Sequence, residues 1–269
     1  IMEYRVDTPG AEGWVTFENL RFEDGRTVSF DSGGVMIRGG RATFINCVFL
    51  NNKGLPSTNS EASAGALRIG TESVVQIIGC TFEGNISDNH GGAIIVGQGS
   101  TAYIHDSVFA NNRTNLPGHR SNGLGGAIHV FNGLEGTTSS LYVTNSRFSN
   151  NQAGFVGGGI MAKGNFASST QPVASPTVVV VANSTFEDNT ALNDPSVTPA
   201  SPTEGGAIMA ENNVSLSVFN SRFINNSGGL GGAISSFRGA ITVESSVFRN
   251  NTAFWRSDTD STGRGGAIK

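Results

Sequence analysis

Apolar and polar residues alternate along short segments of this chain, and the alternation recurs with a phenylalanine near the end of each segment. The anchor phenylalanines are Phe22, Phe49, Phe82, Phe109, Phe148, Phe186, Phe223 and Phe248. The positions seven and five residues before each anchor are apolar in every copy, whereas the position between them is mixed. A period of two is typical of a strand with one face in a core and the other in solvent. Each repeat therefore predicts a set of short β-strands.

A second apolar column follows a glycine-rich segment in each repeat. Its members are Met36, Leu67, Ile94, Ile128, Ile160, Ile208, Ile234 and Ile268, and we expect them to point inward. The residue before each member is small in most repeats, and the residue after it varies in chemical character, which predicts an outward position. Together with the two strands around the anchor, this column predicts three short strands per coil.

Two polar columns flank the anchor phenylalanine. The residue three positions before it is Asn, Asp, Gly or Ser in all eight repeats, and these types suit tight turns with left-handed backbone. The residue three positions after it is an asparagine in seven repeats: Asn52, Asn85, Asn112, Asn151, Asn189, Asn226 and Asn251. Because identical residues stack in a parallel solenoid, we expect this second column to form a ladder of side-chain amides, with the phenylalanines stacked beside it.

The repeat length indicates an elongated fold. Neighbouring anchors are separated by 25 residues between Phe223 and Phe248 and by 39 between Phe109 and Phe148, a range typical of solenoids and propellers. We predict an all-β parallel β-helix of about eight coils, forming a single domain over residues 1–269. The last residue, Lys269, falls midway through a coil, so we expect the chain to be a fragment of a longer one or a subunit that stacks end to end.

Paired motifs carry a resemblance to a known family. One coil contains Phe223-Ile224-Asn225-Asn226 followed by Gly231-Gly232-Ala233-Ile234, and related pairs recur over essentially the whole chain. These pairs resemble the repeat of the chlamydial polymorphic outer membrane proteins, whose signature is Gly-Gly-Ala-Ile with Phe-x-x-Asn. The resemblance implies a right-handed parallel β-helix on a cell surface. The hand comes from the resemblance, since periodicity does not determine it.

Composition narrows the classes of partner. Hydrophobic residues make up 37% of the chain and charged residues 14%, with 37 glycines and a net charge of −4. There is no basic stripe and no long apolar segment, so we expect neither a nucleic-acid partner nor a membrane-spanning segment in this stretch. The resemblance implies an extracellular or cell-surface protein whose partner is a protein or a glycan, with lateral or end-to-end self-assembly as a further option.

The sequence offers two candidate covalent modifications, a disulfide and a glycosylated asparagine. Cys47 and Cys80 occupy the same column two residues before the anchor in neighbouring coils, which places them within disulfide range or makes them two reduced small residues in a serine-rich column. Asn-x-Ser/Thr sequences occur at six asparagines, several of which belong to the repeat itself. Asn213, at the entry to a strand, is the candidate glycosylation site.

Loops and outward columns provide candidate interaction surfaces. Long and short connections alternate after the anchors, and the long ones carry Leu116, Phe254 and Trp255. An outward apolar stripe is expected at Ile37, Ile95, Met161 and Met209, with Phe131 and Phe237 two residues beyond that column in their coils. We expect the long loops to cover this stripe; a lateral partner is the alternative.

Catalytic candidates are few. Asp88 with His90 and His105 with Asp106 are the nearest approach to an acid–base pair, but no stacked carboxylates and no metal-ligand or cofactor motif accompany them. We therefore predict a non-catalytic extracellular scaffold, either an adhesin-like surface protein or a structural subunit of a surface filament. The alternative is a carbohydrate-active enzyme, a lyase or hydrolase of the pectate-lyase-like type.

Overall fold

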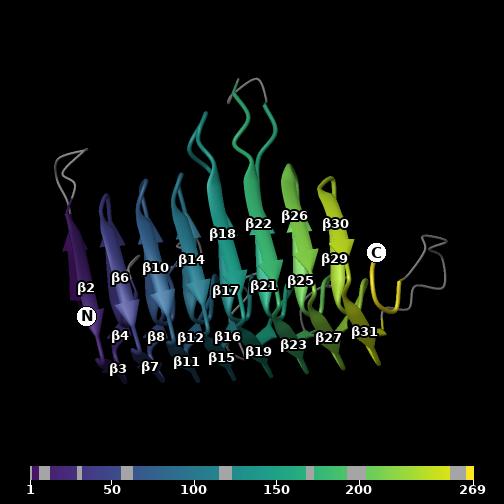
Figure 1. Cartoon of the computed structure of the whole chain (residues 1–269), viewed down its shortest axis with the longest axis horizontal. Coiled ribbons are helices and arrows are strands. Elements are labelled where there is room, and N and C mark those ends of the chain that lie inside the picture. Colours follow the sequence, from purple (N-terminus) through teal and green to yellow (C-terminus); the bar gives the residue numbers. More distant parts are fainter. Residues whose placement is uncertain are drawn as a thin grey trace.

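Parallel strands wind around one axis in the computed structural model, which describes residues 2–5, 13–28, 32–55, 63–114, 123–167, 173–192, 204–254 and 265–269. All described regular elements are strands, and they form four parallel sheets of eight strands each. Figure 1 shows the coils side by side along the longest axis of the molecule, with neighbouring coils stacked strand on strand. The molecule is therefore a parallel β-helix of eight coils, as predicted.

Each coil passes through the four sheets in the same order, and the sheets are named A to D in that order. Sheet A consists of β1 (Met2–Arg5), β5 (Val35–Arg38), β9 (Leu67–Gly70), β13 (Ile94–Gly97), β17 (Ile128–Phe131), β21 (Ile160–Lys163), β25 (Ile208–Glu211) and β29 (Ile234–Phe237). Sheet B consists of β2 (Trp14–Glu18), β6 (Arg41–Ile45), β10 (Val74–Ile78), β14 (Thr101–His105), β18 (Ser139–Thr144), β22 (Thr177–Ala182), β26 (Val214–Phe219) and β30 (Ala240–Glu244).

The other two sheets are built from shorter strands. Sheet C consists of β3 (Arg21–Glu23), β7 (Val48–Leu50), β11 (Thr81–Glu83), β15 (Val108–Ala110), β19 (Arg147–Ser149), β23 (Thr185–Glu187), β27 (Arg222–Ile224) and β31 (Val247–Arg249). Sheet D consists of β4 (Arg26–Thr27), β8 (Lys53–Gly54), β12 (Ile86–Ser87), β16 (Arg113–Thr114), β20 (Gln152–Ala153), β24 (Thr190–Ala191), β28 (Ser227–Gly228) and β32 (Thr252–Ala253).

Sheet D corrects the expected number of strands, because each coil has four strands rather than three. Its strands are two residues long, and only the second residue of each points inward. That residue is small, as at Thr114, Ala153 and Gly228. A two-residue strand with a small inward side chain leaves no alternation to detect in the sequence.

The register of β5, the second strand of sheet A, also differs from the expected one. Val35 pairs with Leu67, so Met36 lies in the outward column and Ile37 points inward opposite Ile69, the reverse of the prediction for both residues. The cause is Gly34, which fills the position that Ala66 takes in the next coil. With glycine in the small-residue position, the inward column begins one residue earlier than the hydrophobicity of Met36 indicated.

Stacked side chains fill the interior. The anchor phenylalanines from Phe22 to Phe248 form one continuous stack, with ring centroids 4.5–5.0 Å apart and ring planes within 17° of parallel. This spacing follows the distance between hydrogen-bonded strands, about 4.8 Å. Exact registry of the coils thus places equal rings face to face, although isolated aromatic pairs prefer offset or edge-on arrangements.

The predicted amide ladder runs beside this stack. The Oδ1 atom of Asn151 accepts hydrogen bonds from the backbone N and the Nδ2 of Asn112, both at 3.0 Å. Its Nδ2 donates to Asn189 Oδ1 and to the carbonyl of Phe109, both at 2.9 Å. Asn85, Asn112, Asn189 and Asn226 repeat this pattern. Each of these buried amides thereby engages both its donor hydrogens and its acceptor.

A thin second layer covers the outer face of sheet A. The residues that precede the Gly-Gly pairs form a row of single parallel bridges, which we call the cover row: His90, Leu124, Val156, Glu204 and Leu230. Val156 packs with Met161 and Met209, whose exposed fractions are 0% and 4%. Met161 and Met209 of the expected outward stripe are thus covered within the chain, by Phe155 and Val156 of a short connection and by Leu124 at the end of a long one. Cover by the central residues of the long loops stays a prediction, since those residues lie outside the described part of the chain.

Candidate functional site

The corner between sheets C and D carries a row of exposed polar side chains. Its residues follow the anchor by two positions, and those at the centre of the molecule are Asn111, Asn150 and Asp188, with φ of 56°, 53° and 55°. Asn and Asp tolerate this left-handed conformation because their side chains interact locally with the backbone. The turn directs these three side chains outward and sends the next residue, such as Asn112, into the interior ladder. We call the outward residues the corner row.

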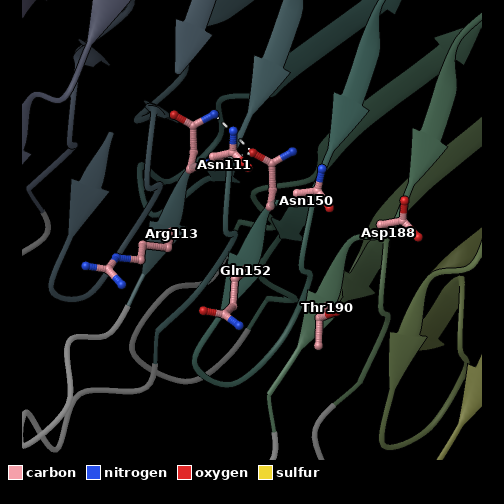
Figure 2. A pocket seen from close by; sticks show the side chains of 8 residues that line it. Asn111, Arg113, Asn150, Gln152, Asp188 and Thr190 are labelled. Atoms are coloured by element: carbon pink, nitrogen blue, oxygen red, sulfur yellow. Dashed lines mark hydrogen bonds between the residues drawn. The ribbon is translucent and has the colours of Figure 1, made fainter. Parts of the chain in front are cut away.

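The first residues of the sheet D strands form a second polar row beside the corner row. Arg113, Gln152 and Thr190 point outward from β16, β20 and β24, whereas the following residue in each strand is buried. Figure 2 shows the two rows, with Asn111, Asn150 and Asp188 in one and Arg113, Gln152 and Thr190 in the other. Together with the ladder residues Asn112 and Asn151 they line a shallow depression of about 340 Å³.

The hydrogen-bonding groups of this depression are largely unused. Among the described residues, no hydrogen bond engages the side chains of Asn111, Asn150 and Gln152, and the Thr190 hydroxyl lies 3.3 Å from that of Ser227. A cation, Arg113, and a carboxylate, Asp188, stand in different coils of the depression. The depression therefore presents both donors and acceptors, with formal charges that balance, to any ligand lying along the axis.

The lining of this depression does not provide paired carboxylates. Asp188 is its one acidic residue, whereas glycoside hydrolysis by acid–base chemistry normally requires two carboxyl groups flanking the bond. In the part of the chain that the structure describes, no group of three or more His, Cys, Asp or Glu side chains could hold a metal ion. The geometry of the depression is suited to binding through hydrogen bonds.

The two catalytic candidates from the sequence lie at different corners of the coil. Asp88 and His90 stand between β12 and β13, at the corner of sheets D and A. His105 is the last residue of β14 and Asp106 follows it, at the corner of sheets B and C. Asp106 adopts a φ of 50° and serves as a turn residue, and His105 Nε2 lies 3.7 Å from its carboxylate. The structure does not bring the two pairs together.

A pair of histidines that the sequence did not connect meets over sheet A. The Nδ1 atoms of His90 and His129 are 3.0 Å apart, and the two rings lie within 12° of parallel. His129 also stacks on Phe131 at 5.1 Å and is only 3% exposed. The repeats contain a sign of this contact. His90 directly precedes a Gly-Gly pair, as the other cover-row residues do, and His129 directly follows an inward isoleucine, as the outward residues of sheet A do.

The two cysteines are free in the structure, which corresponds to the reduced alternative. Both are buried, and the backbone N–H of Cys47 donates to Cys80 Sγ at 3.4 Å. Burial raises the pKa of the Cys80 thiol to about 11. A thiol that stays protonated at neutral pH is a poor nucleophile, so Cys80 is suited to filling space in the column that serine occupies elsewhere.

The remaining candidates have diverse surroundings. Asn213 is half-buried with a φ of 51°, and its Nδ2 donates to the carbonyl of Asn165 at 2.9 Å; its glycosylation stays a prediction. Phe237 is 48% exposed beneath the Arg238 guanidinium, and Phe254 is 37% exposed. Leu116 and Trp255 lie outside the described residues.

Two long connections between sheets A and B carry apolar side chains that the sequence did not single out. They follow β17 and β21 and project beyond the rest of the coils in Figure 1. Ser175 Oγ donates to the carbonyl of Leu134 at 2.9 Å, which ties the two connections together. Leu134, Phe166 and Val173 are 39%, 48% and 53% exposed. Exposed apolar side chains on loops are a common feature of interaction surfaces.

Comparison with known proteins gives one match. A family model described as a right handed beta helix region matches residues 10–171, more than half of the chain. No curated protein and no solved structure shows a significant match. Among the described residues, no helix is long and apolar enough to cross a membrane.

Proposed function

Because the chain belongs to the right-handed β-helix family, we propose that it is a non-catalytic extracellular scaffold of the adhesin-like kind, which binds a glycan through the polar depression on the corner of sheets C and D. The observation that carries this proposal is the contrast within that corner. The interior amides are fully bonded, while the exposed amides of Asn111 and Asn150 and the half-buried amide of Gln152 bond to no other side chain or backbone group of the described residues. The rigid ladder holds these groups in position.

The chemistry of the two rows supports a glycan ligand. Sugars present many hydroxyl groups, each able to donate and to accept, and amide side chains can do both as well. The rows repeat at the coil spacing of about 4.8 Å, so a linear chain lying along the axis meets similar groups in successive coils. A single neutral hydrogen bond contributes only about 1 kcal/mol, so affinity would have to come from repetition along the rows.

A direct test measures binding and turnover in the same samples. Linear oligosaccharides of neutral sugars and of uronic acids are titrated calorimetrically into the wild-type chain and into an Asn111→Gly/Asn150→Gly/Gln152→Ala variant. Glycine is compatible with the left-handed backbone at the first two positions, so the variant should keep its fold. We expect neutral oligosaccharides to bind the wild type and to bind the variant at least about tenfold more weakly, equivalent to 1.4 kcal/mol.

A matched control uses the same row outside the depression, namely Asn225→Gly/Asn250→Gly, which should leave binding unchanged. If no oligosaccharide binds the wild type, or if both variants bind as well as the wild type, the proposed site is wrong. Release of new reducing ends or of unsaturated sugars by the wild type would favour the alternative, a carbohydrate-active enzyme.

A further inference from the structure

His90 and His129 stand in two columns whose next two members are apolar. The cover row continues from His90 to Leu124 and Val156, and the outward column of sheet A continues from His129 to Met161 and Met209. In the neighbouring coils these two sets pack as a small apolar cluster. The histidine pair therefore occupies a place where aliphatic contacts would have been enough to close the layer.

The contact between the rings depends on their protonation state. At a separation of 3.0 Å, one Nδ1 donates its hydrogen and the other accepts it, which requires at least one neutral imidazole. A first added proton can be shared, because a charged ring can donate to its neutral neighbour. A second proton leaves two N–H groups facing each other with no acceptor between them.

The surroundings oppose any positive charge on the pair. Burial is the main cause that lowers the pKa of His90 to about 4, and Arg68 on β9 and Lys163 on β21 lower it further. Burial also lowers the pKa of His129 well below its usual range, with contributions from His90 and Lys163. Three acidic residues lie on the same elements: Asp88 two residues before His90, Glu204 in the cover row, and Glu211, whose carboxylate lies 3.3 Å from Lys163 Nζ. His129 Nε2 has no hydrogen-bond partner among the described residues.

The segment that carries His90 is bonded to the coils on both sides. On one side Asp88 N donates to the carbonyl of Gly54 at 3.0 Å and Gly65 N to that of Gly91 at 3.2 Å, and on the other Gly92 N donates to the carbonyl of Gly125 at 3.1 Å. Gly91 N donates to the carbonyl of Leu124 at 2.9 Å, and Leu124 N donates to the carbonyl of Asn89 at 2.7 Å. The His90 backbone N–H donates to Ser87 Oγ at 3.2 Å. Beneath the segment lies the apolar side chain of Ile95, which is 1% exposed. Release of the segment would expose this outer face of sheet A without disturbing the interior stack.

We propose that the His90–His129 pair is an acid-sensitive latch, which holds the segment 88–92 over sheet A at neutral pH and releases it when both rings become charged. Released rings regain water and their ordinary affinity for protons, so opening takes up as many as two protons. The consequence is a surface that is polar at neutral pH and apolar in acid, with Ile95 as its centre.

The test compares the wild type with a His90→Leu/His129→Met variant, which gives each position the residue that the following coil has there. Binding of the apolar dye ANS is followed from about pH 7 to about pH 3.5, with far-ultraviolet circular dichroism measured in parallel. We expect dye fluorescence to rise several-fold in the wild type while the strand signal stays constant, and not to rise in the variant. His105→Gln, at an exposed histidine, should behave as the wild type.

Histidine ring NMR on the wild type keeps the proposal testable if the double variant does not fold. We expect the rings of His90 and His129 to titrate together, in one step steeper than a single-proton curve and coincident with loss of amide protection in the segment 88–92. Independent one-proton curves, or equal dye binding by the wild type and a folded variant, would overturn the latch.

Discussion

Asn111 and Asn112 are adjacent residues of the same type, but they occupy opposite environments. Asn112 lies in the interior ladder at 0% exposure, where its amide makes four hydrogen bonds with neighbouring coils. Asn111 lies in the corner row, exposed, and its side chain bonds to no other described residue. The backbone makes the difference, because the left-handed turn at Asn111 rotates one side chain out and the next one in. Residue type alone thus says little about role in this fold.

The ladder and the corner row therefore divide two tasks between neighbouring asparagines. Buried amides must be fully paired, because an unpaired buried donor or acceptor costs about 1–3 kcal/mol. Exposed amides have no such requirement and remain available to a ligand. If this division is correct, equal substitutions in the two rows should have very different effects on stability and binding.

Removal of one ladder amide should have the largest effect. Asn151→Ala removes the acceptor for the backbone N–H and the Nδ2 of Asn112 inside the rod, and the side-chain donor to the carbonyl of Phe109. We expect the free energy of unfolding to fall by about 4 kcal/mol, measured by urea denaturation. A loss below about 1 kcal/mol would mean that the ladder contributes little and that the contrast with the corner row is only geometric.

Acid should affect the cover over sheet A and spare the ladder, whose amides do not titrate. The pKa of His90 is about 4 in the folded chain against 6.5 for the free side chain, so an open state binds a proton in this interval and the closed state does not. Stability of the closed cover is therefore complete above about pH 6.5 and decreases as the pH falls towards 4, by about 3 kcal/mol for this group alone.

Hydrogen exchange, corrected for the intrinsic pH dependence of the rates, measures this effect residue by residue. Amides in the segment 88–92 should lose protection through this pH interval, whereas the ladder amide of Asn112 should change much less. Equal loss at both places would show that acid weakens the whole rod.

A smaller effect is expected from the aromatic stack. Phe148→Leu keeps an apolar side chain of similar reach but removes one ring from contacts with Phe109 and Phe186, both at 4.6 Å. We expect a loss of about 1.5 kcal/mol, since the change combines a modest volume defect with lost ring stacking. Differential scanning calorimetry would measure this loss. If stability does not change, the rings are stacked only because the coils are in register, and the stacking itself does not stabilise the fold.

The smallest effects should come from the corner row. Asn150→Gly removes the exposed amide but suits a φ of 53°, and glycine already occupies this row at Gly84. We expect a change within about 0.5 kcal/mol in thermal or urea unfolding. Asn150→Ala removes the same amide but places a Cβ in left-handed backbone, for which we expect about 1 kcal/mol of destabilisation. If glycine costs as much as alanine, the amide itself stabilises the corner.

Much of the fold was predictable because the positions that pack in the interior keep the same residue types from coil to coil. The phenylalanine and asparagine columns recur in fixed relation to each other, and the turn residues from Asn19 to Ser245 all adopt a positive φ or are glycine, as expected. The inward positions of β5 were predicted one residue off because hydrophobicity placed Met36 in the core, whereas packing depends on the glycine at position 34. Sheet D was missed because a two-residue strand has no period.

The candidate site was less predictable, for a physical reason. Exposed side chains are not constrained by packing, so the corner row shows Asn, Asp and Gly without a clear pattern, and its neighbours range from Arg113 to Thr190. Which of these side chains line one depression depends on the register between coils. The His90–His129 contact likewise required knowledge of how the cover row folds back over sheet A.

The ladder has a consequence for how this chain could change length over generations. Each amide bonds only to the coils directly before and after its own, so every internal coil offers the same two faces to its neighbours. Duplication or loss of one whole coil would leave all remaining junctions intact, as expected for a quasi-one-dimensional repeat protein. A gene encoding such a rod can therefore lengthen or shorten by recombination between its own repeats and still encode a protein that folds.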